Sequence, residues 1–291
     1  MLPSLTQRLW QLVLVLLAVI GLVAVTNPAL AVPAGERPSH GATAPGGTYL
    51  ALGDSVPFGY VGNRPDLYPD PDNFVGYPEL VARDLGLRLL NASCPGETTA
   101  SFIDATAQSN GCQNSFGSDL GYRDRFPLHV DYEGSQLDYA LQVLEEEPHV
   151  RLVTLQLGAN DGFLCQRTGE CSTPEGLAAL AERVRVNLDH ILCTLREEGD
   201  YRGRLVVVTY YALDYADPVG VASTRILNAA ITAAAAENRA VVADGFTAFQ
   251  SRALQAGGSS IAAGLVHPND VHPTAEGQRL LADAVERAVG H

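Results

Sequence analysis

Short runs rich in valine and leucine alternate along this chain with longer segments of helical periodicity. The runs are too short to be helices, and they lie at residues 48–52, 88–91, 150–157, 204–210 and 240–243. Apolar strands joined by helices indicate a parallel sheet that is covered on both faces. We therefore predict an α/β fold, a three-layer α/β/α sandwich with a five-stranded parallel sheet. Among the intervening helices we expect one over residues 77–85, one over 98–108, one that starts at a polar cap on Ser135 and one over 222–238.

The N-terminus has the features of a secretory signal peptide. Arg8 is followed by an apolar run over residues 12–25 and by the small-residue cleavage signal Ala29-Leu30-Ala31. The run is shorter than the ~20 residues that a spanning helix needs, which favours a cleaved signal over a retained membrane anchor. We expect a secreted, monomeric protein with a signal peptide at 1–31, a flexible lead-in at 32–47 and one folded domain at 48–291.

The charge balance limits the partners of this chain. Its formal net charge is −14 at pH 7. Nucleic-acid binding would need basic patches, and adhesion to anionic lipid by charge alone would need a cationic surface. We therefore expect no nucleic-acid partner, and we interpret the acidity as a contribution to solubility.

The five cysteines all follow the signal segment, so an oxidising compartment would permit disulfides between them. Proximity favours the pairs Cys94–Cys112 and Cys165–Cys171, although spacing alone leaves other connectivities open. Cys193 falls within a helical pattern, and we interpret it as a small buried apolar residue. No CxxC or HExxH spacing occurs, so we expect no metal site.

Polar blocks follow the predicted strands, at the points where ligands bind in parallel sheets. Gly53-Asp54-Ser55-Val56 follows the first strand, Gly96-Glu97-Thr98 comes shortly after the second, and Gly158-Ala159-Asn160-Asp161 follows the third. A fourth block, Asn269-Asp270-Val271-His272-Pro273, leads into the last predicted helix. Together these blocks are predicted to bring a serine, a glycine, an asparagine and a histidine to one edge of the sheet.

The four blocks, in this order, resemble those of the SGNH/GDSL hydrolases, which have a flavodoxin-like α/β/α fold. The resemblance covers essentially the whole chain after the signal segment. It implies a carboxylic-ester hydrolase, an esterase or lipase, that acts on small-molecule or lipid esters without a cofactor. Ser55 would be the nucleophile and His272 the general base. The backbone N–H groups of Ser55 and Gly96 and the side-chain amide of Asn160 would form the oxyanion hole.

The fourth block departs from the family pattern in one position. The family has an aspartate three residues before the histidine, where this chain has Asn269. Asp270 lies two residues before His272, on the same side of an extended segment, and we take it as the third catalytic residue. Asn269 or a backbone carbonyl remains an alternative acceptor for the second ring nitrogen of His272.

Substrate identity stays open at this stage. Seven aromatic residues near strand ends either line an acyl pocket or pack within loops: Phe58, Tyr60, Tyr68, Phe74, Tyr210, Tyr211 and Tyr215. The same machinery would also serve a polysaccharide O-deacetylase. A non-catalytic exported binding protein is a third hypothesis, which the presence of Ser55, Asn160 and His272 disfavours.

Overall fold

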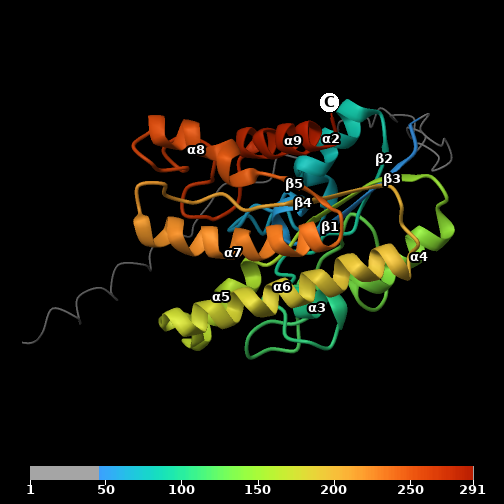
Figure 1. The fold of residues 1–291 in the computed structure, drawn as a ribbon, viewed down its shortest axis with the longest axis horizontal. Coiled ribbons are helices and arrows are strands. Elements are labelled where there is room, and N and C mark those ends of the chain that lie inside the picture. The colour runs from blue at the N-terminus through green and yellow to red at the C-terminus, as the bar shows by residue number, and fades with distance from the viewer. Residues whose placement is uncertain (1–45, 291) are drawn as a thin grey trace, which may run out of the picture. The chain divides into compact units, whose positions relative to one another are not determined.

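The centre of the fold is a five-stranded parallel sheet (Figure 1). The computed structural model describes residues 46–290, so the predicted signal peptide and nearly all of the lead-in lie outside the described residues. The strand order is β2-β1-β3-β4-β5. The strands are β1 (Thr48–Gly53), β2 (Arg88–Asn91), β3 (Val150–Gln156), β4 (Arg204–Val208) and β5 (Val241–Ala243). The predicted five-stranded parallel sheet is confirmed.

Helices cover both faces of this sheet (Figure 1). One face carries α2 (Tyr77–Leu85), α8 (Gly245–Gln255) and α9 (Ala275–Val289). The other carries α3 (Thr99–Ile103), α4 (Gln136–Glu146), α5 (Ala159–Thr168), α6 (Pro174–Glu197) and α7 (Pro218–Glu237). Three one-turn elements lie in loops: α1 (Ser55–Phe58), η2 (Pro71–Asn73) and η3 (Glu170–Ser172). The α/β/α sandwich is therefore confirmed as well.

The central strands are buried on both sides, as their composition predicts. Every residue of β1 is buried, and Leu50 and Leu52 are fully so. The hydroxyl of Tyr49 on β1 is paired within this core, because it lies 2.7 Å from that of Thr154 on β3. Burying a leucine side chain contributes roughly 1.5–3 kcal/mol, so this core supplies a rigid base for the loops at its carboxyl edge.

Local capping sets the helix ends, and it explains two differences from prediction. The helix expected over residues 98–108 ends at Ile103, because the carboxylate of Asp104 accepts the backbone N–H and the hydroxyl of Thr106 and forms a turn. The helix expected from residue 222 begins at Pro218, because Asp217 caps it by accepting two backbone N–H groups. By composition α7 could span a membrane, yet it packs along α6 and contacts β4 and β5.

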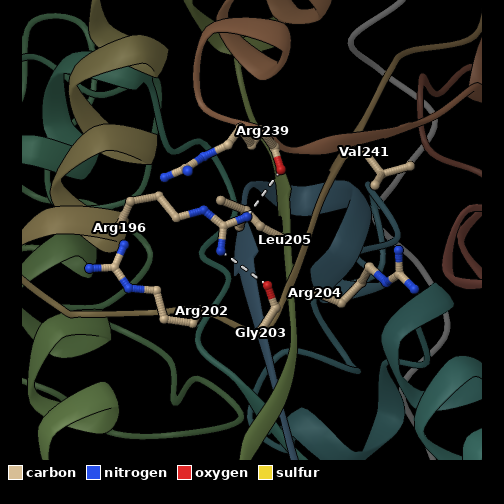
Figure 2. Close-up of a pocket in the computed structure, with 7 residues that line it drawn as sticks. All are labelled: Arg196, Arg202, Gly203, Arg204, Leu205, Arg239 and Val241. Carbon is tan, nitrogen blue, oxygen red and sulfur yellow. Dashed lines mark hydrogen bonds between the residues drawn. The ribbon is translucent and has the colours of Figure 1, made fainter.

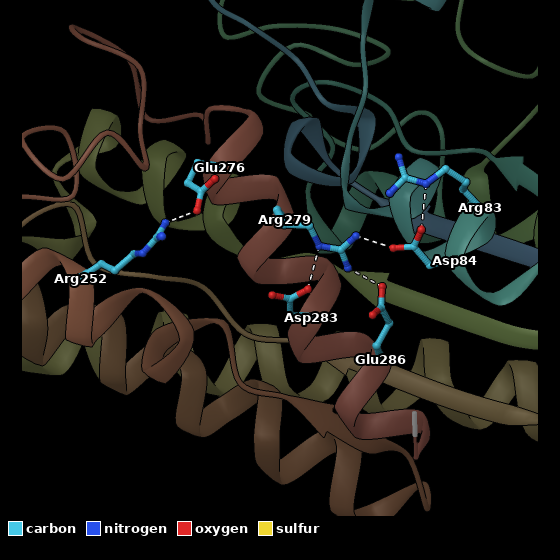
Figure 3. A network of polar contacts seen from close by, with 7 residues as sticks. All are labelled: Arg83, Asp84, Arg252, Glu276, Arg279, Asp283 and Glu286. Atoms are coloured by element: carbon cyan, nitrogen blue, oxygen red, sulfur yellow. Dashed lines mark hydrogen bonds and ion pairs between the residues drawn. The ribbon is translucent and has the colours of Figure 1, made fainter.

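Ion pairs join α9 to its neighbours on the outer face (Figure 3). The guanidinium of Arg279 lies 2.5 Å from Asp84 of α2 and 2.7 Å from Asp283 of α9, and it also pairs with Glu286. Arg252 of α8 pairs with Glu276 of α9. Solvent reaches all these groups, so each pair contributes only ~0.5 kcal/mol and mainly fixes helix orientation.

A depression of about 550 Å³ lies at the opposite edge of the sheet, where β4 and β5 begin (Figure 2). Four arginines line it, and two of them, Arg196 and Arg202, have partners close by. The guanidinium of Arg196 donates to the carbonyls of Tyr201, Gly203 and Arg239, and Arg202 pairs with Asp200. We interpret this region as structural, because the Arg196 side chain connects the end of α6 to the segments that precede β4 and β5.

Candidate active site

Ser55 lies on a tight turn at the carboxyl end of β1. Gly53 has φ +137°, and a Cβ at this position would come within 2.1 Å of the carbonyl oxygen of Gln156. The carboxylate of Asp54 accepts the backbone N–H of Val56 at 2.9 Å and so caps α1. A glycine and an aspartate therefore shape the turn on which Ser55, which is partly exposed, begins α1.

His272 connects Ser55 to Asp270. Its Nε2 lies 2.9 Å from Ser55 Oγ, and its Nδ1 lies 2.5 Å from Asp270 Oδ1. Because an ionised carboxylate only accepts, the proton lies on Nδ1 and Nε2 accepts from the hydroxyl of Ser55. The two side chains that flank the ring are thus placed as in a Ser-His-Asp triad.

A turn over residues 267–272, and not the extended segment that we expected, brings Asp270 to the imidazole. The N–H of Asp270 donates to the carbonyl of His267 at 3.2 Å, and Asn269 has φ +59°. Asn269 is exposed, and within residues 46–290 its side chain forms no hydrogen bond. Of the two side chains considered as acceptors for His272 Nδ1, Asp270 therefore contacts the imidazole and Asn269 does not.

The surroundings of Asp270 keep it ionised. Partial burial alone would raise its pKa, but hydrogen bonding and charge attraction from His272 outweigh burial and lower the pKa to about 2. The N–H groups of Gly62 and Val271 also donate to it, at 2.8 and 2.7 Å. A Cβ at Gly62 would come within 2.9 Å of Asp270 Oδ2, so glycine is required there.

The other two predicted oxyanion-hole residues lie on two segments that contact each other, Gly96 in the loop after β2 and Asn160 in the first turn of α5. The amide nitrogen of Asn160 donates to the carbonyl of Glu97 at 3.0 Å, and its oxygen accepts from Asn110 at 2.8 Å. These bonds orient the amide and leave its second N–H free to donate. Gly96 has φ +88°, and a Cβ there would lie 2.7 Å from Gly111 Cα, so only glycine fits.

A cavity of about 450 Å³ opens beside Ser55, Asn160 and His272. Its far walls come from α5, α6 and α7 and are mostly apolar, with Phe163, Leu177, Leu180, Leu213, Val219 and Leu227. Gly96 is not among the lining residues.

Tyr210 and Tyr211 line the cavity, whereas Phe58 and Phe74 are buried in a separate loop cluster with Tyr60 and Tyr68 packed against it. Tyr215 packs in the main core, where its hydroxyl donates to the carbonyl of Phe246, so two of the seven aromatics line the cavity and five pack elsewhere.

Both predicted cysteine pairs are disulfide bonded, Cys94 to Cys112 and Cys165 to Cys171. The first joins the Gly96 loop to the segment around Asn110, and the second lies at the end of α5, where Cys171 also lines the cavity. Cys94, Glu97 and Cys112 form the one candidate metal-ligand group within residues 46–290, but the disulfide occupies both sulfurs.

The interpretation of Cys193 as buried is wrong: it is exposed, because α6 turns Ile191, Leu192 and Leu195 inward instead.

Two buried carboxyl groups, Asp54 and Glu97, and two partly buried ones, Glu79 and Asp161, have raised pKa values, and sequence reasoning gave Glu79 and Glu97 no role. Desolvation raises the pKa of Asp54 and Asp161 to about 6, against hydrogen bonds from Tyr210 and Thr99, respectively. Desolvation also raises the pKa of Glu79 and Glu97 to about 7, against hydrogen bonds from Asn91 and Ser101, respectively. Each group is therefore easier to protonate in the folded chain than in the unfolded chain.

We expect the protein to melt at a higher temperature at pH 5 than at pH 8. Stability from a raised carboxyl pKa is fully present below the unfolded value of about 4 and is lost as pH rises through 6–7. A difference of roughly 5 °C or more is expected, since 1 kcal/mol corresponds to about 2–4 °C in a domain of this size. Calorimetry across pH 4–8 measures this, and Glu79→Gln should flatten the profile. Equal melting temperatures at pH 5 and pH 8 would contradict the prediction.

Comparison with known proteins agrees with the fold and with the family resemblance. A model described as the GDSL-like lipase/acylhydrolase family matches residues 51–280. An acetylxylan esterase from Geobacillus stearothermophilus is similar in structure, with 16% identity and a TM-score of 0.52 over 86% of this chain and 96% of that chain. An alpha/beta hydrolase from the metagenome of Lake Arreo, Spain, has 17% identity and a TM-score of 0.53 over 84% and 95%, respectively. No curated protein matches the chain.

Proposed function

Because the chain belongs to the GDSL-like lipase/acylhydrolase family and is an ester hydrolase, we propose that it acts through an acyl-enzyme formed on Ser55. The observation that carries the proposal is the contact series Ser55 Oγ to His272 Nε2 at 2.9 Å and His272 Nδ1 to Asp270 at 2.5 Å. This arrangement also argues against a non-catalytic binding protein, which would not need an activated hydroxyl.

In the proposed reaction, Ser55 Oγ attacks the ester carbonyl carbon while its proton passes to His272 Nε2. Asp270, which stays ionised, stabilises the resulting imidazolium. The N–H groups of Ser55 and Gly96 and the amide of Asn160 would bind the carbonyl oxygen as it becomes negative. His272 then returns the proton to the leaving alcohol, and a water activated by His272 releases the acid.

We propose that the protein acts outside the cell as a monomer. Two disulfides in the folded domain support an oxidising compartment, and the N-terminal sequence has the signal-peptide pattern described above. Secretion of the full chain with loss of about 31 residues, measured by mass spectrometry of the exported protein, tests this part of the proposal.

The cavity favours esters with an apolar acyl chain. An acetyl group would occupy only a small part of its 450 Å³, and the remaining walls present leucine, valine and phenylalanine side chains. Hydrolysis of O-acetyl polysaccharide is the second candidate, because the similar Geobacillus structure is an acetylxylan esterase. A panel of p-nitrophenyl esters of graded chain length, glycerides and acetylated xylan separates the two.

Replacing Leu227 with tryptophan should shift the acyl-chain preference. Leu227 lines the cavity, and its Cδ1 would lie 3.3 Å from a Cβ built on Gly158, so a larger side chain narrows a confined space. Since each buried CH₂ contributes ~0.8 kcal/mol, the ratio of kcat/KM for octanoate to that for acetate should fall by about tenfold or more. Leu254→Trp on the exposed face of α8 is the matched control. An unaltered ratio in Leu227→Trp would place the acyl chain elsewhere.

Asn160→Ala should lower kcat by ~10²–10³-fold with little change in KM, because the amide is proposed to donate mainly to the transition state. Steady-state kinetics on one soluble ester measures both constants. If KM rose while kcat held, Asn160 would be a substrate-binding residue instead.

A further inference from the structure

We propose that Glu97 and Gln136 are positioning residues, which hold the Ser55 turn and the Asn160 side chain in one fixed arrangement. The inference rests on the proposed function, since the groups they hold are the proposed oxyanion donors. Gln136 begins α4 and Glu97 precedes α3, two helices that contact each other on the same face of the sheet (Figure 1). Both side chains are fully buried.

Gln136 holds the end of β1. Its side-chain oxygen accepts the N–H of Gly53 at 2.6 Å, and its amide nitrogen donates to the carbonyl of Gly53 at 3.0 Å. A side-chain amide thus pairs both backbone groups of the residue that lies two positions before Ser55. The carbonyl of Gly53 also accepts the N–H of Cys94 at 3.0 Å, so loss of the Gln136 side chain would leave the buried N–H of Gly53 unpaired.

Glu97 holds Gln136 in turn. Its Oε2 accepts from the amide nitrogen of Gln136 at 3.0 Å, and its Oε1 accepts from Ser101 at 2.5 Å and from Gln113 at 3.0 Å. Within residues 46–290 no arginine or histidine lies within ion-pair distance of it. A buried carboxyl group without a cation is a costly way to stabilise a fold, which points to a role in geometry.

The same residue reaches the proposed oxyanion hole through its backbone. The carbonyl of Glu97 accepts from the amide nitrogen of Asn160, and the oxygen of that amide accepts from Asn110. The backbone N–H of Asn110 then donates to the carbonyl of Gly96 at 2.8 Å. One hydrogen-bonded series therefore runs from Gly53 to Gly96 and connects the segments that carry all three proposed donors.

Such a series matters because catalytic donors act only when they are placed to within about 0.5 Å. Gln136→Leu leaves the N–H of Gly53 unpaired and removes the link to Glu97, so we expect kcat to fall by ~10–100-fold with KM within about threefold of wild type. The affinity of an alkyl boronic acid, which binds Ser55 as a tetrahedral adduct, should fall in parallel with kcat. Glu97→Gln keeps one oxygen to accept from Ser101 and Gln113 but turns an N–H₂ group toward the amide nitrogen of Gln136, so it should lie between wild type and Glu97→Leu.

The matched control is Tyr49→Phe, which removes a buried hydrogen bond between β1 and β3 that lies outside the series. It should lower the melting temperature without changing kcat. If Gln136→Leu fails to fold, Asn110→Ala tests the same hydrogen-bonded series, because Asn110 lies on a partly exposed loop and donates to Asn160. We expect this variant to lose kcat several-fold.

Two results would overturn the inference while leaving the proposed function standing. One is an active wild type in which the folded Gln136→Leu and Asn110→Ala variants keep kcat. The other is that Tyr49→Phe and Gln136→Leu both lose kcat in proportion to the fall in their melting temperatures. A wild type that hydrolyses no ester and fails to react with a fluorophosphonate would instead refute the proposed function itself.

Discussion

Ser55→Ala is expected to abolish ester hydrolysis and leave the fold intact. The side chain lies at the edge of the sheet on a turn shaped by Gly53 and Asp54, so its loss removes little packing. Without the hydroxyl no acyl-enzyme forms, and kcat should fall by roughly 10⁴–10⁶-fold. Hydrolysis of a p-nitrophenyl ester measures the loss, and circular dichroism checks the fold.

His272→Ala should be nearly as severe, and the double variant should be no worse than either single variant, because the two residues act as a unit. Fluorophosphonate labelling should disappear in Ser55→Ala and mark Ser55 in the wild type. Ser93, which is fully buried and hydrogen bonded to Asn91, serves as the internal control, because the probe should leave it unlabelled. More than a trace of activity in Ser55→Ala, or a label on another serine, would refute the assignment of the nucleophile.

Periodicity and strand-end motifs predicted most of the architecture from the sequence. The helix 77–85 and the cap at Ser135 match the structure, because each has its own local signals, a glycine after the helix end in one case and a capping box in the other. The helix α5 was missed, since it begins directly after Gly158 without a side-chain cap and mixes polar and apolar residues. The local sequence therefore predicts the end of a helix only where a hydrogen bond between neighbouring residues sets that end.

The site divides in the same way. Ser55, Gly96 and Asn160 were predicted because each lies in a motif that follows a strand, and His272 because its motif leads into the last helix. Glu97 and Gln136 were not, although Glu97 directly follows Gly96. Their roles depend on contacts between segments that are 39 or more residues apart, which no local pattern records. The exposure of Cys193 was missed because a helical pattern with many apolar residues does not fix which of them point inward.

The identity of the third catalytic residue leads to the second large effect. Asp270→Asn should lower kcat by about 10⁴-fold, as carboxylate-to-amide changes do in other triads. The new side chain lacks the charge that stabilises the imidazolium. It also has one oxygen where Asp270 uses two, so the N–H groups of Gly62 and Val271 and His272 Nδ1 would compete for it. The wrong imidazole tautomer would then be favoured at Ser55.

Asn269→Ala provides the matched comparison. Asn269 is exposed and occupies the left-handed region at φ +59°, so alanine should cost ~1 kcal/mol of stability, and kcat should stay within about tenfold of wild type. Asn269→Gly should recover the stability, because glycine accepts that backbone conformation. If both Asp270→Asn and Asn269→Ala stayed within tenfold, a backbone carbonyl would be the acceptor for His272. If Asn269→Ala were the more damaging of the two, the amide would be the third member of the triad, and the 2.5 Å contact of Asp270 would be structural.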